Sequence, residues 1–138
     1  MKLLFLLLLP FFSIAQQKGA NVIKVSNVSF DQCVSALIAD GFIIDRIDKE
    51  YKVITTKPLE VKKAGTVIIL QVNQKDSALM IRGQLSETIG LVIGGQNIKS
   101  ESSRIVNKGM RGSVNKLCFD RMNDFARSLG GEVSYIVQ

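Results

Sequence analysis

Residues 29–56, SFDQCVSALIADGFIIDRIDKEYKVITT, decide the fold of this chain, because their apolar pattern changes there from a helical to an extended period. The apolar residues of the first half recur three and four positions apart, as on one face of an α-helix: Phe30, Cys33, Val34, Leu37 and Ile38. Ser29 and Gln32 have the spacing of a capping box, and Gly41 suits the left-handed conformation that ends many helices. The sequence therefore predicts a helix over residues 30–40.

The second half of this stretch predicts a β-hairpin. Residues 42–47 and 51–56 are rich in β-branched and aromatic side chains, and the polar residues 48–50 between them suit a turn. Pro58 ends the second strand, because proline has no N–H to donate to a ladder. We expect residues 57–65 to form a basic connector.

Further strands are predicted on both sides of this stretch. Residues 22–26 form a short strand, and residues 66–72 form a strand so apolar that it should lie in the middle of a sheet. A turn at residues 73–76 leads to a return strand over residues 77–85. Its two faces alternate: one carries Leu79, Ile81, Gly83 and Leu85, and the other carries Ala78, Met80, Arg82 and Gln84. Only the first face has the composition of a core.

The segment from residue 86 to residue 112 is rich in glycine and serine and predicts a long loop. Loops of this length are usually functional or disordered, although residues 89–93 could form a short strand. Ser113 then caps a second amphipathic helix, which ends at Gly130 and Gly131, and alternating residues from Val133 to Val137 predict a last strand.

The predicted fold class is α+β. The order is strand, helix, four strands, long loop, helix, strand. We expect a mostly antiparallel sheet of five to six strands with both amphipathic helices on one face. The other face is left to solvent, to the long loop or to a partner.

The first fifteen residues have the layout of a secretory signal peptide. Met1 and Lys2 precede an apolar run of about ten residues, half of the roughly twenty that a membrane-spanning helix needs. Ser13 and Ala15 place small residues before a cleavage site at Gln16. We therefore expect a single domain over residues 16–138 in the periplasm or outside the cell. Gln16 stands where bacterial lipoproteins carry their lipid-bearing cysteine, so we expect no lipid anchor and no transmembrane segment after cleavage.

The chain has two cysteines, Cys33 and Cys118, on the apolar faces of the two predicted helices. An oxidising compartment favours a disulfide between them, but buried free thiols are an equal alternative. Pairing requires the two Cα atoms to lie within about 7 Å of each other.

The composition argues against catalysis. The chain has no histidine, which removes the usual general base at neutral pH and the commonest zinc ligand. The glycines at residues 90–95 are followed by Gln96 and Asn97 where a phosphate-binding loop needs lysine and a hydroxyl. Asp45, Asp48 and Glu50 fit no calcium-loop spacing. We expect neither an enzyme nor a bound cofactor or metal.

The formal net charge of +6 suits either a soluble surface or an anionic target, which could be an acidic partner, an anionic glycan or an anionic lipid. Export argues against a nucleic-acid target.

The capped helix, the residues Ala39-Asp40-Gly41-Phe42-Ile43-Ile44, the acidic turn and the strand Val53-Ile54-Thr55-Thr56 resemble the helix-grip, or TBP-like, domains of small exported bacterial proteins, such as those in the BamC lipoprotein. The resemblance covers about two thirds of the mature chain. It implies two helices on one face of a curved antiparallel sheet and a role as an interaction module. The chain differs in lacking the lipid-bearing cysteine and in carrying the segment 86–112.

We therefore expect a non-catalytic binding or assembly module whose partner is another envelope or secreted protein; the sequence leaves its oligomeric state open. The expected binding residues are Met80, Arg82 and Gln84, which project from the uncovered face of the sheet. The alternative is a carrier of a small lipophilic ligand, with a cavity between sheet and helices near Leu70, Ile81, Met122 and Phe125.

Overall fold

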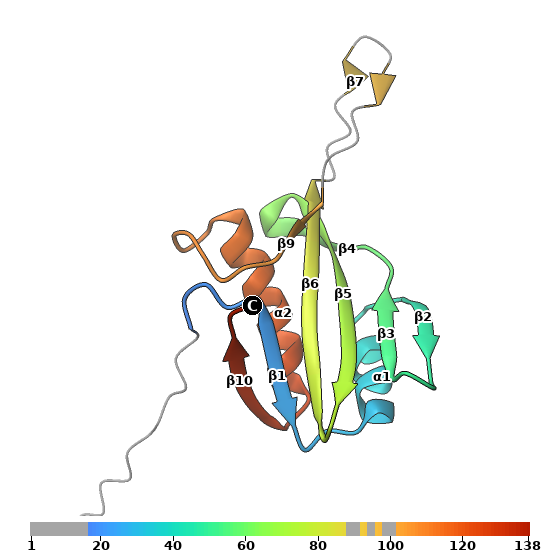
Figure 1. Cartoon of the computed structure of the whole chain (residues 1–138). Helices are drawn as coiled ribbons and strands as arrows, with labels where there is room; N and C mark the ends of the chain where they lie inside the picture. The colour runs from blue at the N-terminus through green and yellow to red at the C-terminus, as the bar shows by residue number, and fades with distance from the viewer. Residues whose placement is uncertain (1–16, 88–91, 94–95, 98–101) are drawn as a thin grey trace, which may run out of the picture.

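The structure, a computed structural model, describes residues 17–87, 92–93, 96–97 and 102–138. These residues form an antiparallel sheet of eight strands with the α-helices α1 (Phe30–Ala39) and α2 (Val114–Ser128) on one side (Figure 1). The α+β class and the broad order of elements are confirmed, but the sheet has eight strands instead of the predicted five to six, because the short strands β4 and β9 join it by pairing with β5 and β6. The expected signal peptide, residues 1–15, lies outside the described residues.

The main sheet follows the order β10-β1-β6-β5-β3-β2, and two short strands join it, β4 beside β5 and β9 beside β6. Strands β7 and β8 pair separately. The strands are β1 (Val22–Ser26), β2 (Ile44–Asp48), β3 (Val53–Thr56), β4 (Leu59–Val61), β5 (Thr66–Lys75), β6 (Ala78–Glu87), β7 (Val92–Ile93), β8 (Gln96–Asn97), β9 (Ser103–Arg104) and β10 (Glu132–Ile136).

The central hairpin of β5 and β6 is longer than predicted. Its ladder runs from Thr66 opposite Glu87 to Lys75 opposite Ala78, so the turn lies at Asp76 and Ser77. The turn predicted at residues 73–76 is therefore wrong. Asn73 is polar but pairs in register with Val53 of β3, and this tertiary pairing outweighs its turn propensity.

The connector predicted over residues 57–65 also contains regular structure. Its first part is β4, which pairs with β5, and a 3-10 helix, η1 (Lys62–Ala64), follows. Gly65 then takes a left-handed backbone conformation, with φ of 61°, as the chain enters β5.

Both helix starts follow the sequence prediction. The Ser29 hydroxyl accepts from the Gln32 amide at 3.1 Å, and the Gln32 side chain accepts from the Ser29 amide at 2.9 Å. Ser113 caps α2 by accepting from the Lys116 amide at 3.4 Å, a longer contact. Gly41 follows α1 with φ of 93°.

The core lies between the sheet and the two helices. Phe42, just after α1, meets Phe125 of α2 edge to face, with ring centroids 5.8 Å apart. A Cβ on Gly83 would lie 2.5 Å from Ile105 Cδ1 and 3.1 Å from Met122 Sδ. Gly83 therefore lets the residue after β9 and the helix α2 approach the middle of β6.

Cys33 and Cys118 are free thiols, and both are fully buried. Of the two alternatives that the sequence left open, the structure therefore has the buried free thiols and not the disulfide. Each cysteine lies in the hydrophobic core as a small apolar residue.

The long loop predicted over residues 86–112 is partly regular. Strand β6 continues to Glu87, and β9 pairs with β6 at Gln84 and Leu85. Ile105, the residue after β9, is fully buried in the core. Of the short strand predicted at residues 89–93, Val92 and Ile93 form β7, and residues 89–91 lie outside the described residues.

Candidate functional site

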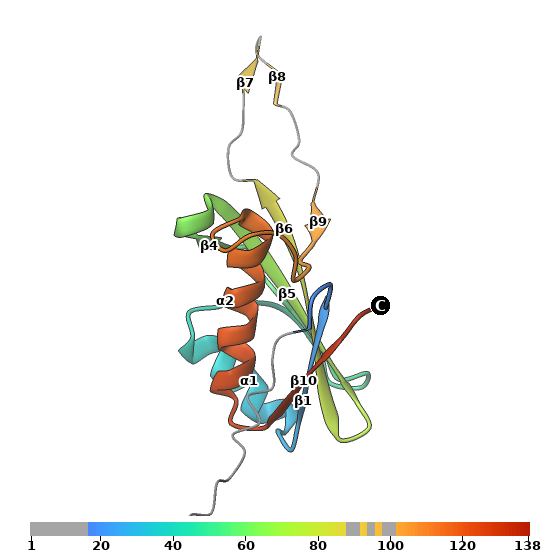
Figure 2. The same ribbon diagram turned by 90° about the vertical axis from the view of Figure 1, so that its left-hand side faces the viewer.

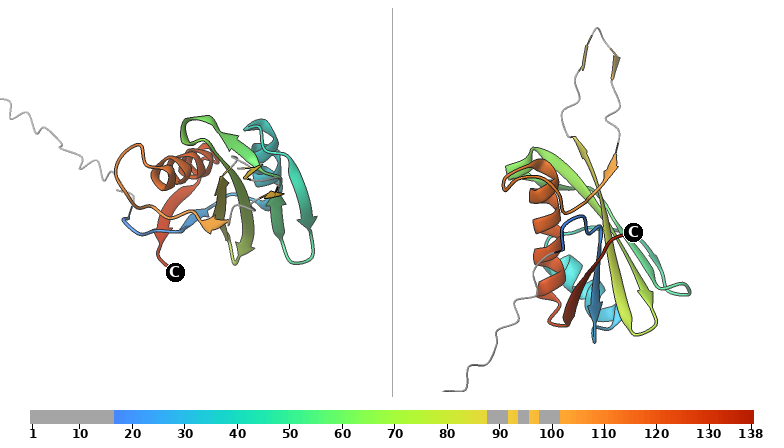
Figure 3. Two further views of the ribbon diagram at one scale, coloured as in Figure 1. Left: turned by 90° about the horizontal axis from the view of Figure 1, so that it is seen from above. Right: turned by 60° about the vertical axis from the view of Figure 1, so that its left-hand side comes forward.

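The face of the sheet opposite the helices is the candidate binding surface. Figures 2 and 3 show α1 and α2 together on the other side. Side chains alternate between the two faces of a strand, and those of the core face belong to the hydrophobic core. We call the opposite side the open face and define it by these residues: Val22, Lys24, Thr55, Ile69, Gln71, Met80, Arg82, Gln84 and Arg104.

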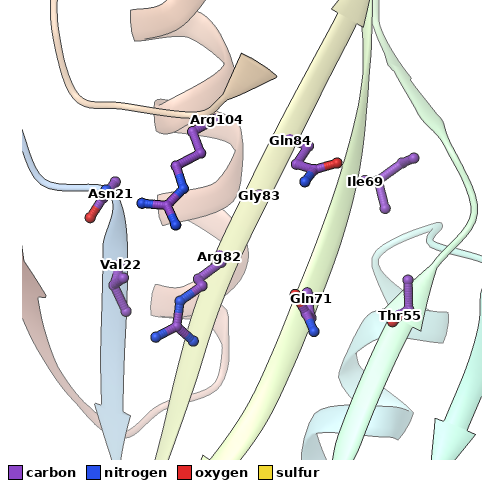
Figure 4. Close-up of a pocket in the computed structure, with 9 residues that line it drawn as sticks. All are labelled: Asn21, Val22, Thr55, Ile69, Gln71, Arg82, Gly83, Gln84 and Arg104. Carbon is purple, nitrogen blue, oxygen red and sulfur yellow. The ribbon is translucent and has the colours of Figure 1, made fainter. Parts of the chain in front are cut away.

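A pocket of about 240 Å³ lies in the middle of the open face. Five strands or their ends contribute to it, and Figure 4 shows the residues that line it. We call it the arginine pocket; its lining is Asn21, Val22, Thr55, Ile69, Gln71, Arg82, Gly83, Gln84 and Arg104. Val22 and Ile69 supply apolar surface, and most of the remaining side chains carry hydrogen-bonding groups.

Arg82 is held in place by two hydrogen bonds. It donates from Nη1 to Asn73 Oδ1 at 2.7 Å and from Nη2 to Gln138 Oε1 at 3.0 Å. Gln138 is itself fixed, because its backbone exchanges two hydrogen bonds with the Asn21 side chain, at 2.9 and 3.0 Å. A guanidinium has five N–H donors, so Arg82 is oriented while donors remain for a ligand.

Arg104 joins the pocket through strand pairing. It lies opposite Gln84 in the ladder of β9 and β6, and its side chain is exposed. Both guanidinium groups extend toward the strand β1 side of the pocket, that of Arg104 near Asn21 and that of Arg82 near Val22 (Figure 4). Arg104 was not among the predicted binding residues, because the composition of residues 86–112 predicted a loop. The apolar Ile105 beside it was the signal that could have indicated an ordered strand.

The described lining of the pocket holds two arginines and no aspartate or glutamate. The ion pairs found within the described ranges lie elsewhere, between Lys116 and Asp120 and between Arg121 and Asp40. Asp48 lies on the edge strand β2, and its carboxylate already accepts the Glu50 and Tyr51 amides of the hairpin turn, both at 3.0 Å. The arginine pocket is therefore a positively charged site without an internal counter-ion in the described lining.

Two of the three predicted binding residues, Arg82 and Gln84, line this pocket. Met80 belongs to the same face but not to the lining, and only 8% of it is exposed. It lies in the ladder between Lys24 of β1 and Asn73 of β5. Met80 thus lies on the predicted face but offers a partner little exposed surface.

A second cavity, of about 390 Å³, lies between α2 and the β4–η1 segment. Its lining mixes acidic and basic side chains: Glu60, Lys62, Lys63, Asp120, Arg121 and Asp124 together with Val61 and Leu117. Asp120 and Arg121 already have ion-pair partners in Lys116 and Asp40. Although this cavity is the larger, its balanced charges favour no class of ligand.

The residues expected to line a lipophilic cavity, Leu70, Ile81, Met122 and Phe125, are all fully buried in the core. Both cavities described above lie away from them. In the part of the chain that the structure describes, no group of three or more cysteine, aspartate and glutamate side chains is placed to hold a metal ion. Nor does any helix described here have the length and apolar character needed to cross a membrane.

No protein-family model matches this chain, and no curated protein matches its sequence. The geometry of the open face and of its pocket is therefore the basis for an inference about function.

Proposed function

We propose that the chain is a non-catalytic binding or assembly module of the periplasm or the extracellular space. In this proposal the open face binds an acidic segment of another exported protein. The observation that carries it is the arginine pocket, which places two guanidinium groups at the centre of a sheet face that neither described helix covers.

Charge complementarity favours an acidic partner. By strand register, Arg46 lies on the same face as Thr55, and Lys75 on the same face as Gln71, so the face carries Lys24, Arg46, Lys75, Arg82 and Arg104. The acidic residues that share it are Asp48 and Glu132 on the two edge strands and Glu60 on the short strand β4, so none of them lies on the central strands β1, β5 and β6. A cluster of one sign of charge raises the association rate of an oppositely charged partner.

The export part of the proposal rests on the sequence of residues 1–15. Protein purified from the native host is expected to begin at Gln16, which the intact mass of the chain would show. A chain that retains Met1 would contradict export by this route, without bearing on the open face.

The binding part is tested by photo-cross-linking at single positions in the native host. A photoreactive phenylalanine replaces Gln84, which is exposed in the pocket, or, as controls, Asp31 on α1 and Arg127 on α2, which are exposed on the helical side. We expect one cross-linked product from position 84 that is absent at both controls and is lost when Arg104→Glu is added.

Equal cross-linking from all three positions would contradict the proposal, as would products from the helical side alone. Arg104→Glu suits this test because Arg104 is exposed, so that reversing its charge leaves the core packing intact. A Met80→Asp variant would not suit it, because it places a charge at a site that is only 8% exposed.

A further inference from the structure

The arginine pocket has the chemistry of a carboxylate site. We propose that Arg82 and Arg104 together bind one aspartate or glutamate side chain of the partner segment, with Gln71 and Gln84 as additional donors. This inference rests on the proposed function and names the group that the pocket recognises.

The two guanidinium groups supply the charge and the donors. Arg82 is pre-oriented by Asn73 and Gln138, at 2.7 and 3.0 Å, so little of its side-chain freedom is left to be lost on binding. Arg104 is exposed and has no ion-pair partner within the described residues. A guanidinium can bind a carboxylate through two parallel hydrogen bonds, and such charge-assisted bonds are stronger than those between neutral groups.

The backbone around the pocket favours a carboxylate over a phosphate. Strands β1, β5 and β6 are each paired on both sides, so their amides are used by the sheet ladder. Phosphate sites commonly use several free backbone N–H groups at a helix N-terminus or a glycine-rich loop. On these three strands the donors that face the pocket are therefore side-chain groups, which suits a ligand group with two acceptor oxygens.

The size of the pocket agrees with a single side chain. Its volume of about 240 Å³ is below the range of pockets that enclose a whole drug-sized ligand. Ile69 offers apolar contact for the methylene stem of a glutamate, and Thr55 adds a polar group to the lining.

The test uses fluorescein-labelled hexaglutamate as the probe and measures its fluorescence anisotropy with the full folded domain at low salt. The variants are Arg82→Gln and Arg104→Gln. The matched control is Lys75→Gln, which removes the same charge from an exposed position of β5, about 13 Å along the strand from Gln71. Circular dichroism checks that each variant is folded.

We expect hexaglutamate to bind and labelled hexaglutamine not to bind. Arg104→Gln should weaken binding roughly tenfold, as the loss of one charge-assisted contact predicts. Lys75→Gln should change it less than twofold. Equal losses of hexaglutamate affinity in Arg104→Gln and Lys75→Gln would overturn the inference, because the attraction would then depend on the net charge and not on the pocket. Displacement of the probe by inorganic phosphate at lower concentrations than by free glutamate would overturn the choice of a carboxylate.

The outcomes separate this inference from the proposed function. Position-specific cross-linking at Gln84 that survives Arg82→Gln and Arg104→Gln would leave the open face as the binding surface but refute the carboxylate site. Cross-linking that is absent at Gln84, together with tight hexaglutamate binding, would support the site and refute the protein partner.

Discussion

Two adjacent glycines follow α2, and each is needed for a different reason. Gly130 has φ of 78°, and a Cβ added there would meet no other atom within 4 Å, so its requirement is conformational. At Gly131 an added Cβ would collide with the Ser26 carbonyl oxygen and crowd Val25 and Val28. Its requirement is the close approach of the chain to β1 as β10 begins.

Gly130→Ala is expected to lower the free energy of unfolding by about 1 kcal/mol, the strain of a left-handed alanine. Gly131→Ala should cost at least about 2 kcal/mol, because the backbone of β1 must shift. Asparagine separates the two causes, since it tolerates the left-handed region: Gly130→Asn should be close to wild type, and Gly131→Asn should not. Urea denaturation measures all four variants, and equal losses at the two positions would contradict this explanation.

The two cysteines are predicted to be unreactive in the folded domain. Burial raises the pKa of Cys33 from 9.0 to about 12 and that of Cys118 from 9.0 to about 11. Since the thiolate is the reactive form, a thiol reagent at neutral pH should label the chain only after unfolding. Rapid labelling of the native protein would contradict the burial of these thiols.

The same pKa shifts predict an alkaline loss of stability. The folded state holds its thiol protons more tightly than the unfolded state, so the stabilisation is complete below pH 9 and declines as the pH rises through about 11 and 12. Urea denaturation between pH 8 and pH 11 should show this decline. The Cys33→Ala and Cys118→Ala double variant should decline less steeply, and identical slopes would refute the assignment.

At the residue scale, alternation along the return strand was enough to place Arg82 and Gln84 on the open face. It could not show that Met80 is covered, because that depends on its neighbours Lys24 and Asn73 across the ladder. Arg104 was missed for a similar reason: its role depends on the pairing of β9 with β6, a contact between residues about twenty positions apart.

Helix α1 begins with two reciprocal hydrogen bonds, and α2 begins with a single longer one. Ser29→Ala is therefore expected to lower the free energy of unfolding by about 1 kcal/mol. Ser113→Ala should cost less, because its contact with the Lys116 amide is 3.4 Å long. Urea denaturation of the two variants compares them directly, and a larger loss in Ser113→Ala would contradict the described cap geometry.

Arg121 ties α2 to the end of α1. Its guanidinium donates to Asp40 Oδ2 at 2.7 Å and to the Asp40 carbonyl at 3.1 Å, and it lies 4.9 Å from the Phe42 ring centroid. These contacts satisfy a carbonyl at the C-terminus of α1. They also place a positive charge where the helix dipole favours one.

Arg121→Ala is expected to cost roughly 1–2 kcal/mol of stability. Arg121→Lys should recover only part of the lost stability, because an ammonium cannot reproduce the two hydrogen bonds that the guanidinium donates to Asp40. Thermal denaturation measures the series. Full recovery by lysine would show that the charge alone matters.

Elements with local signals were the ones that the sequence predicted well. Helix α1 has a capping box and a regular apolar period, and both appear in the structure. Strands β4 and β9 have only three and two residues, and they exist because β5 and β6 offer them a ladder. No local pattern marks such strands, since their stability comes from pairing with distant residues.

At the scale of the whole molecule, the apolar faces of both helices pack against the same side of the sheet. This leaves the open face with its basic residues and with the arginine pocket near its centre. The amphipathic helices predicted this one-sided arrangement. The clustering of Arg82 and Arg104 on the open face could be recognised only from the strand pairing in the structure.

The most direct test of the open face maps where an acidic ligand binds, by following the backbone amide NMR signals of the folded domain as hexaglutamate is added. We predict that the shifted signals belong to the strands around the arginine pocket, namely β1, β3, β5, β6 and β9, and that those of α1 and α2 stay in place. Shifts centred on the helices, or spread evenly over every lysine and arginine, would contradict the assignment of the open face as the binding surface.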